Sequence, residues 1–306
     1  MQGSDSVTHR YPLLPYLTGL ITLLLLLPAG AGQSAGTGGA DRAGILDAIA
    51  ASPFHEPVHL TSAEGEREVR GDIHAILDAP LATLADTLGN VEDWCGILFL
   101  HLNVKACVYG DEPDGPGLTL YMGRKSYQDA EVVEQMRLDF YRDQAGEGLV
   151  AVRLQADRGP QGIRDVRLDL QAVPLDENRS LLHLHYTVGY GALARMAMGL
   201  YFAFGGRDRI GFTIVDRDPE GRPVHVDGIR GMIERNTVRF YFALKAYLRE
   251  PDHDRLEIRL AHWFDLTERH PEQLREMDRD TYLAQKLREY ENQVALQARG
   301  EEPAWP

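Results

Sequence analysis

Two histidines separated by one residue, His183 and His185, are the first side chains in the sequence whose types and spacing could do chemistry. They lie in an alternating stretch, 181–190, so both rings would share one face of a β-strand and could supply two ligands to a metal ion. No third ligand follows at a convincing spacing, and no His-Glu-x-x-His sequence occurs. Because the pair lies opposite the apolar side chains of the same strand, we interpret these residues as solvated and predict no metal site.

Motifs for nucleotide binding or covalent catalysis are weak or missing in the sequence. Gly189-Tyr190-Gly191 lacks the third glycine of a dinucleotide loop and ends an alternating stretch. There is no Walker A motif and no Gly-x-Ser-x-Gly elbow, and Ser126 has no base near it in the chain. We therefore predict no catalytic residue and no cofactor, while an enzyme stays open as an alternative.

The N-terminus has the order of an export signal. Arg10 precedes an apolar run from Leu13 to Leu27, and small residues follow up to Ala31. This order predicts a cleaved signal peptide, residues 1–31, and a periplasmic or secreted protein. The run from Leu13 to Ala31 is also long enough to span a bilayer, so an N-terminal membrane anchor is the alternative. Residues 32–68, which begin with a Gly/Ser-rich stretch, are predicted to be a linker and N-terminal segment.

Export changes the interpretation of the two cysteines, Cys95 and Cys107. In an oxidising compartment a disulfide between them is the first expectation. The alternative is two buried thiols too far apart to bond. A metal site built on the pair would need histidine partners at ligand spacing, and the sequence offers none.

The middle of the chain alternates between apolar and polar residues, which is typical of strands buried on one face. Glycine, proline, aspartate and asparagine separate these stretches, as expected of turns. The pattern predicts an antiparallel sheet of about six to seven strands, at 69–77, 118–124, 134–142, 149–156, 164–172, 181–190 and 210–215.

Helical patterns interrupt and follow the predicted strands. Residues 80–101 contain Gly89 and Asn90 and are predicted to form two short helices rather than one. A second helical stretch covers 192–204, and a third covers 231–249 and ends before Pro251. The charged segment 252–299 is also helical in pattern, and we expect it to dock on the core, with a partner protein as the alternative.

The 231–249 stretch places Asn236 and Thr237 within a wide apolar face that also contains Phe240 and Tyr247. A buried amide and a buried hydroxyl need hydrogen-bond partners. Either they bond to neighbouring backbone or buried water, or they point into a cavity and hold the polar head of a ligand.

The 192–204 stretch crowds methionine and aromatic residues together, among them Met196 and Phe202. Such side chains form adaptable apolar surfaces, so this stretch is either ordinary core or a lid or wall of a cavity. Arg195 stands within it and needs an anion, from a protein carboxylate or from an acidic ligand head.

The element order resembles that of a known superfamily. A first strand ending in LDAPL (77–81), helices ending in WCGILF (94–99), a meander of about six strands and a final ERNTVRFYFALKAYL helix (234–248) are similar to START/Bet v 1 helix-grip proteins, also called SRPBCC. The chain would be an exported bacterial member. The resemblance covers 69–249, and it implies an α+β fold in which a curved antiparallel sheet grips a long C-terminal helix around an apolar cavity. The 192–204 insertion and the 252–299 extension depart from the family pattern.

Members of that superfamily typically carry lipids, sterols or other hydrophobic molecules, and a minority are cyclases or hydrolases. The resemblance therefore implies a non-catalytic binding or carrier protein whose partner is a hydrophobic small molecule or lipid. The alternatives are an enzyme acting on a lipophilic substrate and an envelope interaction protein that uses 252–299. The residues predicted to contact the ligand are Trp94, Phe99, Met122, Tyr186, Tyr190, Arg195, Met196, Phe202, Asn236, Thr237, Phe240 and Tyr247.

Composition and charge exclude several classes of protein. The 306 residues are 44% apolar and carry a formal charge of -14 with two cysteines. A disulfide-stapled miniprotein and a wholly disordered chain are excluded. The net negative charge argues against a nucleic-acid binder and against general binding to anionic membranes.

Overall fold

The computed structural model describes residues 38–54, 56–112, 115–143, 148–191 and 209–299. The predicted signal peptide and the predicted 192–204 helix lie outside these residues. The chain divides into two compact units, Met1–Arg42 and Ala43–Pro306, and the sheet and helices that follow helix α1 belong to the second. Helix α1 itself covers Gly38–Ala50.

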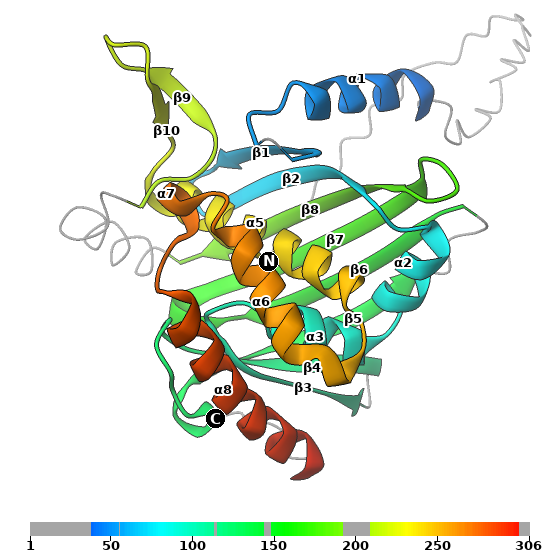
Figure 1. The fold of residues 1–306 in the computed structure, drawn as a ribbon, viewed down its shortest axis with the longest axis vertical. Coiled ribbons are helices and arrows are strands. Elements are labelled where there is room, and N and C mark those ends of the chain that lie inside the picture. The colour runs from blue at the N-terminus through cyan, green and yellow to red at the C-terminus, as the bar shows by residue number, and fades with distance from the viewer. Residues whose placement is uncertain (1–37, 55, 113–114, 144–147, 192–208, 300–306) are drawn as a thin grey trace, which may run out of the picture. The chain divides into compact units, whose positions relative to one another are not determined.

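One antiparallel sheet of eight strands forms the centre of the second unit (Figure 1). Its spatial order is β1-β2-β8-β7-β6-β5-β4-β3. The register aligns Ile73, Leu184 and Leu170 across β2, β8 and β7, and all three are buried. This row identifies the inner face, against which the helices pack. The strands are β1 (Val58–Glu64), β2 (Glu68–Leu77), β3 (Val104–Glu112), β4 (Gly115–Met122), β5 (Glu134–Asp143), β6 (Val150–Arg158), β7 (Ile163–Pro174) and β8 (Ser180–Tyr190).

Two short helices follow β2, as the sequence predicts. Helix α2 (Leu81–Leu88) ends at Gly89, and α3 (Val91–Leu98) begins after Asn90, whose side chain accepts a hydrogen bond from the Glu92 amide at 3.0 Å. An asparagine cap of this kind satisfies one of the free amides of a new helix, so the chain starts a second helix here rather than extending the first.

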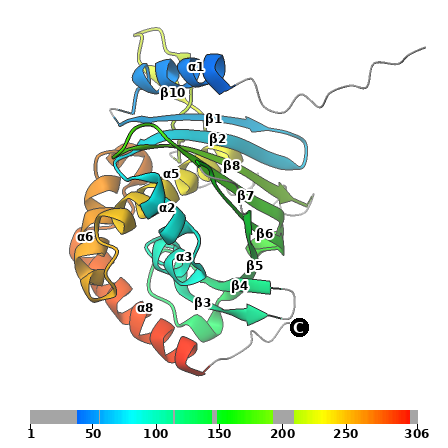
Figure 2. The ribbon, with the colours of Figure 1, turned by 90° about the vertical axis from the view of Figure 1, so that its right-hand side faces the viewer.

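The long helix α5 (Gly228–Arg249) crosses the inner side of the sheet. The extension places α6 on the side of α5 away from the sheet and α8 below them in the view of Figure 2. Helix α6 (Leu256–Thr267) lies along α5, where the Trp263 indole donates to the Arg239 carbonyl at 3.0 Å. The chain continues through α7 (Pro271–Leu274) into α8 (Arg279–Arg299). The predicted α+β helix-grip architecture is confirmed, and the 252–299 extension docks on the core.

The sheet has two strands that the sequence pattern did not predict, β1 and β3. β3 reads VKACVYGDE and shows no clear alternation, because both of its faces are covered. Cys107 faces the inner core, whereas Ala106 and Val108 belong to a second cluster with Leu296 of α8. The stretch expected as a strand at 210–215 contributes instead to a separate hairpin, β9 (Ile214–Arg217) with β10 (Pro223–His225).

Helix α8 protects the exposed edge of the sheet. Gln293 accepts a hydrogen bond from the Cys107 amide at 2.8 Å, and Gln297 pairs with both the amide and the carbonyl of Tyr109 at 2.9 Å. An unpaired edge strand is a template for aggregation, and covering it with polar side chains of a helix removes that template.

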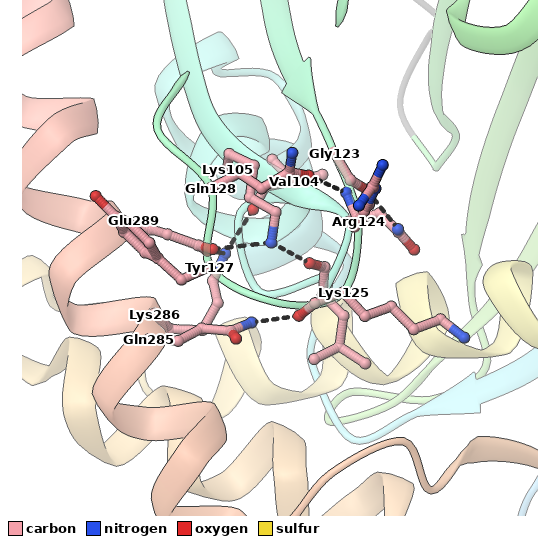
Figure 3. Close-up of polar contacts among 12 residues, drawn as sticks. Val104, Lys105, Gly123, Arg124, Lys125, Tyr127, Gln128, Gln285, Lys286 and Glu289 are labelled. Carbon is pink, nitrogen blue, oxygen red and sulfur yellow. Dashed lines mark hydrogen bonds and ion pairs between the residues drawn. The ribbon is translucent and has the colours of Figure 1, made fainter. Parts of the chain in front are cut away.

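A fully buried charged triad joins α8 to β3 (Figure 3). Lys105 of β3 and Lys286 of α8 each donate to the Glu289 carboxylate at 2.8 Å, and all three side chains have no exposed surface. Each ammonium also donates to a backbone carbonyl, Lys105 to Leu102 and Lys286 to Val104. Burial lowers the pKa of both lysines, that of Lys286 to about 8, so the shared carboxylate is what keeps them charged.

The substitution Glu289→Gln should lower the free energy of unfolding by about 3–5 kcal/mol, because it leaves two buried ammonium groups without a counter-charge. Urea denaturation measures the change. The exposed Glu291 on the same helix provides the control, and Glu291→Gln should change stability by less than about 0.5 kcal/mol. A loss of under 1 kcal/mol in Glu289→Gln would contradict the role of the triad.

The predicted disulfide is present and joins α3 to β3. Cys95 and Cys107 are bonded with their Cα atoms 5.2 Å apart, and both side chains are buried. The bond closes a loop across 12 positions of sequence. It holds α3 against the inner face beside the strand that α8 covers from the other side.

Replacing both cysteines by alanine should lower the free energy of unfolding by roughly 3 kcal/mol, because the unfolded chain regains the entropy of the open loop. Denaturation of the wild type with and without reductant gives the same comparison. The double variant should be insensitive to reductant, and a wild type that is equally insensitive would disprove the stabilising role.

Candidate functional site

The inner side of the sheet is not completely covered. Met122 of β4, Leu168 of β7 and Val188 of β8 lie on the inner face and are only partly buried, although all three pack against the core. On α5, Met232 and Phe240 share this property. Apolar side chains inside a fold are normally close-packed. Their residual exposure indicates a region where the helices leave the sheet incompletely filled.

Asn236 and Thr237, the predicted polar pair on α5, differ in their hydrogen-bond partners and in their exposure. The Thr237 hydroxyl donates to the Ile233 carbonyl one turn earlier at 2.8 Å and lies close to the Tyr186 side chain. Asn236 is partly exposed and accepts a hydrogen bond from Arg239 at 3.2 Å. Thr237 therefore has an intrahelical partner, whereas Asn236 lies on the open side of the helix.

Phe240 of α5 and Met122 of β4 are both partly buried and pack against the core. The Phe240 ring stacks on His101 with 4.5 Å between ring centroids. Met122 ends β4 on the same inner face. Tyr186 lies further across the sheet on β8 and is buried, and burial raises the pKa of its hydroxyl.

The other aromatic residues predicted at the site have partners elsewhere. The Trp94 indole donates to the Leu88 carbonyl at 2.8 Å, and Tyr247 donates to Asp93 at 2.6 Å. Phe99 lies under the Lys286 ammonium, 3.7 Å from its ring centroid. Tyr190 donates to the Gly65 carbonyl at 3.2 Å, beside the β1–β2 turn. Of the predicted residues, Thr237 lies close to Tyr186 and Phe240 stacks on His101, while Arg195, Met196 and Phe202 lie outside the described residues.

A cationic cluster adjoins the open side of α5. Among the residues that the structure describes, four cationic side chains reach the carboxylate of Glu276, which lies between α7 and α8. Lys125 and Arg209 contact it directly, the Arg239 Nη2 is 2.9 Å from it, and the Arg235 Nη2 is 3.7 Å from it. Although burial raises the pKa of Glu276, the hydrogen bond from Lys125 and the charge of Arg239 outweigh burial and lower it to about 2.

His101 connects this cluster to Phe240. The imidazole is buried, and its Nδ1 accepts a hydrogen bond from the Asn103 amide at 3.1 Å. Burial and the charges of Arg239, Lys286 and Lys125 lower the pKa of His101 well below its usual value, so the ring is neutral at pH 7. Because Nδ1 accepts, the proton resides on Nε2, and that atom has no hydrogen-bond partner among the described residues.

Sequence reasoning did not predict Lys125, His101, Arg239 or Glu276 as site residues. The helical pattern of 231–249 puts Arg235 and Arg239 opposite the apolar face, where an exposed helix carries its charges. The predicted docking of the 252–299 extension could have revealed this cluster. If the extension covers the second side of the helix, the arginines on that side become buried and need carboxylate partners.

The predicted histidine pair lies on the outer face of the sheet. His183 Nε2 and His185 Nδ1 are 2.8 and 3.0 Å from one Asp72 oxygen, and the His74 ring stacks on His183 at 4.4 Å. Although burial raises the pKa of Asp72, the hydrogen bonds from both histidines outweigh it and lower the pKa. Within the described ranges, no three histidine, cysteine, aspartate or glutamate side chains are placed to hold a metal ion.

A surface hollow lies elsewhere, lined by Asp78 and by residues 176–179 at the β7–β8 turn. Its lining residues are charged or carry an amide, and none of them belongs to the partly buried apolar set described above. No helix within the described part of the chain has the length and apolar character needed to cross a membrane.

Comparison with known proteins yields structural likenesses alone. No protein-family model and no curated protein matches the sequence. An aromatase/cyclase from Streptomyces sp. R1128 is similar over 65% of this chain and 96% of its own, with 15% identity and a TM-score of 0.34. A conserved protein of unknown function from Enterococcus faecalis is similar over 83% of this chain and 99% of its own, with 9% identity and a TM-score of 0.35. At these identities and scores the likenesses carry no argument about function.

Acid should destabilise the protein through Glu276. Its pKa is lowered from 4.5 to about 2 on folding, so its contribution to stability is complete above about pH 4.5 and is lost as the pH falls toward 2. The contribution is roughly 3 kcal/mol at most. Chemical denaturation at pH 5 and at pH 3 measures the loss of unfolding free energy between the two values. This loss should be smaller for Glu276→Gln than for the wild type. An equal loss would show that Glu276 is not a source of the acid sensitivity.

Proposed function

We propose that the protein is an exported, non-catalytic binding or carrier protein for a hydrophobic small molecule or lipid. The observation that carries the proposal is the partial burial of Met122, Leu168 and Val188 on the inner face of the sheet and of Met232 and Phe240 on α5. Apolar surface held open inside a fold is costly unless a ligand covers it, and such concave apolar surfaces are where small molecules bind.

Burial supplies the binding free energy in this proposal. A ligand that loses about 300 Å² of apolar surface gains about 7 kcal/mol before the entropic costs of association. The residual affinity would suit a carrier, because a carrier must release its cargo. No group needs to be activated chemically for this function.

The disulfide supports the part of the proposal that concerns compartment. A buried Cys95–Cys107 bond forms and persists most readily outside a reducing cytoplasm. This agrees with the export signal expected at residues 1–31.

Native mass spectrometry of the purified protein, combined with lipid extraction, tests the proposal. A stoichiometric apolar adduct is expected. Leu168→Trp should reduce its occupancy at least about fivefold, because the larger side chain fills part of the space at a partly buried inner-face position.

The matched control is Ile258→Trp, at a half-exposed position of α6. It should leave occupancy unchanged. Circular dichroism and thermal melting confirm that both variants fold. An apo mass with no uptake from a lipid extract, or equal occupancy in wild type and Leu168→Trp, would contradict the proposal.

A further inference from the structure

The apolar region ends in a set of unused hydrogen-bond donors. His101 Nε2 and Arg239 Nε are buried and have no hydrogen-bond partner among the described residues. Arg239 has no exposed side-chain surface, and its two other nitrogens already bond to Asn236, Leu274 and Glu276. A buried donor without an acceptor costs about 1–3 kcal/mol, and the cost is larger for a charged group.

Both donors are buried, but each contacts a partly exposed residue of α5. Arg239 donates to the side-chain oxygen of Asn236. His101 stacks on Phe240, which belongs to the incompletely filled region. The apolar surface and the donors therefore meet within one turn of the helix.

Lys125 brings the cluster within reach of solvent. It lies three residues after Met122, at the end of β4, and 30% of its side chain is exposed. Burial lowers its pKa to about 8 even though Glu276 opposes the shift, so the ammonium gains from any additional negative charge. Glu276 is the carboxylate that Lys125 and Arg239 share.

We propose that the ligand is a single-chain amphiphile with an anionic head, a carboxylate or a phosphate, which binds at the cluster formed by Lys125, His101 and Arg239. This inference rests on the proposed function and specifies its ligand class. The acyl chain covers the partly exposed inner-face residues, and the head group accepts hydrogen bonds from the Arg239 Nε and His101 Nε2 and neutralises Lys125. A neutral head group satisfies the donors less strongly, because charge-assisted hydrogen bonds are about twice as strong.

Paired probes separate the charge of the head group from the chain. Oleate is compared with oleyl alcohol, and oleoyl lysophosphatidic acid with monoolein, by titration below the concentrations at which the probes form micelles. Each anion should bind the wild type about tenfold more tightly than its neutral partner. The anion that binds more tightly, oleate or oleoyl lysophosphatidic acid, shows whether the site prefers a carboxylate or a phosphate.

Lys125→Gln removes the most accessible cation and should weaken binding of the anions about tenfold while leaving the neutral probes unchanged. The matched control is Lys245→Gln, because Lys245 is a similarly exposed lysine that pairs with Glu56. Glu276→Gln should change the affinity for the anions in the opposite direction. It removes a carboxylate that competes for the same cations, so the anions should bind more tightly, provided that circular dichroism shows a folded variant.

The outcomes separate this inference from the proposed function. If anionic and neutral probes bind the wild type equally and Lys125→Gln changes neither, the anionic head group is excluded while the hydrophobic carrier stands. If no probe binds, both are overturned. Selective loss of anion binding in Lys125→Gln, absent from Lys245→Gln, establishes the inference.

Discussion

A single helix cannot cover an eight-stranded sheet, and the arrangement of the remaining elements follows from this constraint. Eight strands about 4.8 Å apart make a sheet roughly 34 Å wide, whereas a helix with its side chains is about 10 Å across. Helix α5 contacts β1 and β2, α2 contacts β6 and β7, and α3 contacts β3 and β4. Partly exposed apolar side chains on β4, β7 and β8 agree with a wide curved sheet that narrow helices cover incompletely.

The C-terminal extension covers the outer side of α5, the side that faces away from the sheet. Once α6 and the α7–α8 turn cover that side, Arg235 and Arg239 lose their access to water and need a carboxylate. Glu276 provides it, and Glu289 does the same for Lys105 and Lys286 on the next helix. The two glutamates therefore supply the counter-charges that docking of the extension requires.

The sequence predicted the elements whose two faces differ and missed those whose faces are alike. Strands β2 and β5–β8 alternate because one face is more exposed than the other, and each was predicted near its observed bounds. β4 was also predicted, because Leu118, Leu120 and Met122 alternate with Thr119 and Tyr121, although both of its faces are buried. β3 was missed because α8 buries its outer face, and β1 because only its first half alternates between buried and partly buried residues. The disulfide followed from cysteine number and export, whereas the Glu276 cluster joins residues from 125 to 276 and depends on tertiary packing that no local pattern encodes.

A net charge of -14 does not oppose an anionic ligand at this position. Charges on the surface are screened beyond about 10 Å at 0.1 M salt, so the ligand experiences the groups within the first few ångströms of its head. There, Lys125 and Arg239 share Glu276, with the Nε2–H of His101 beside them. The acidic exterior instead disfavours adsorption to anionic surfaces. An acyl chain that gains free energy from burial can carry a charged head past that exterior, whereas a free anion of the same charge would gain nothing from the apolar region. In the proposed binding mode, the apolar wall and the buried donors together would select for amphiphiles over either hydrocarbons or simple anions.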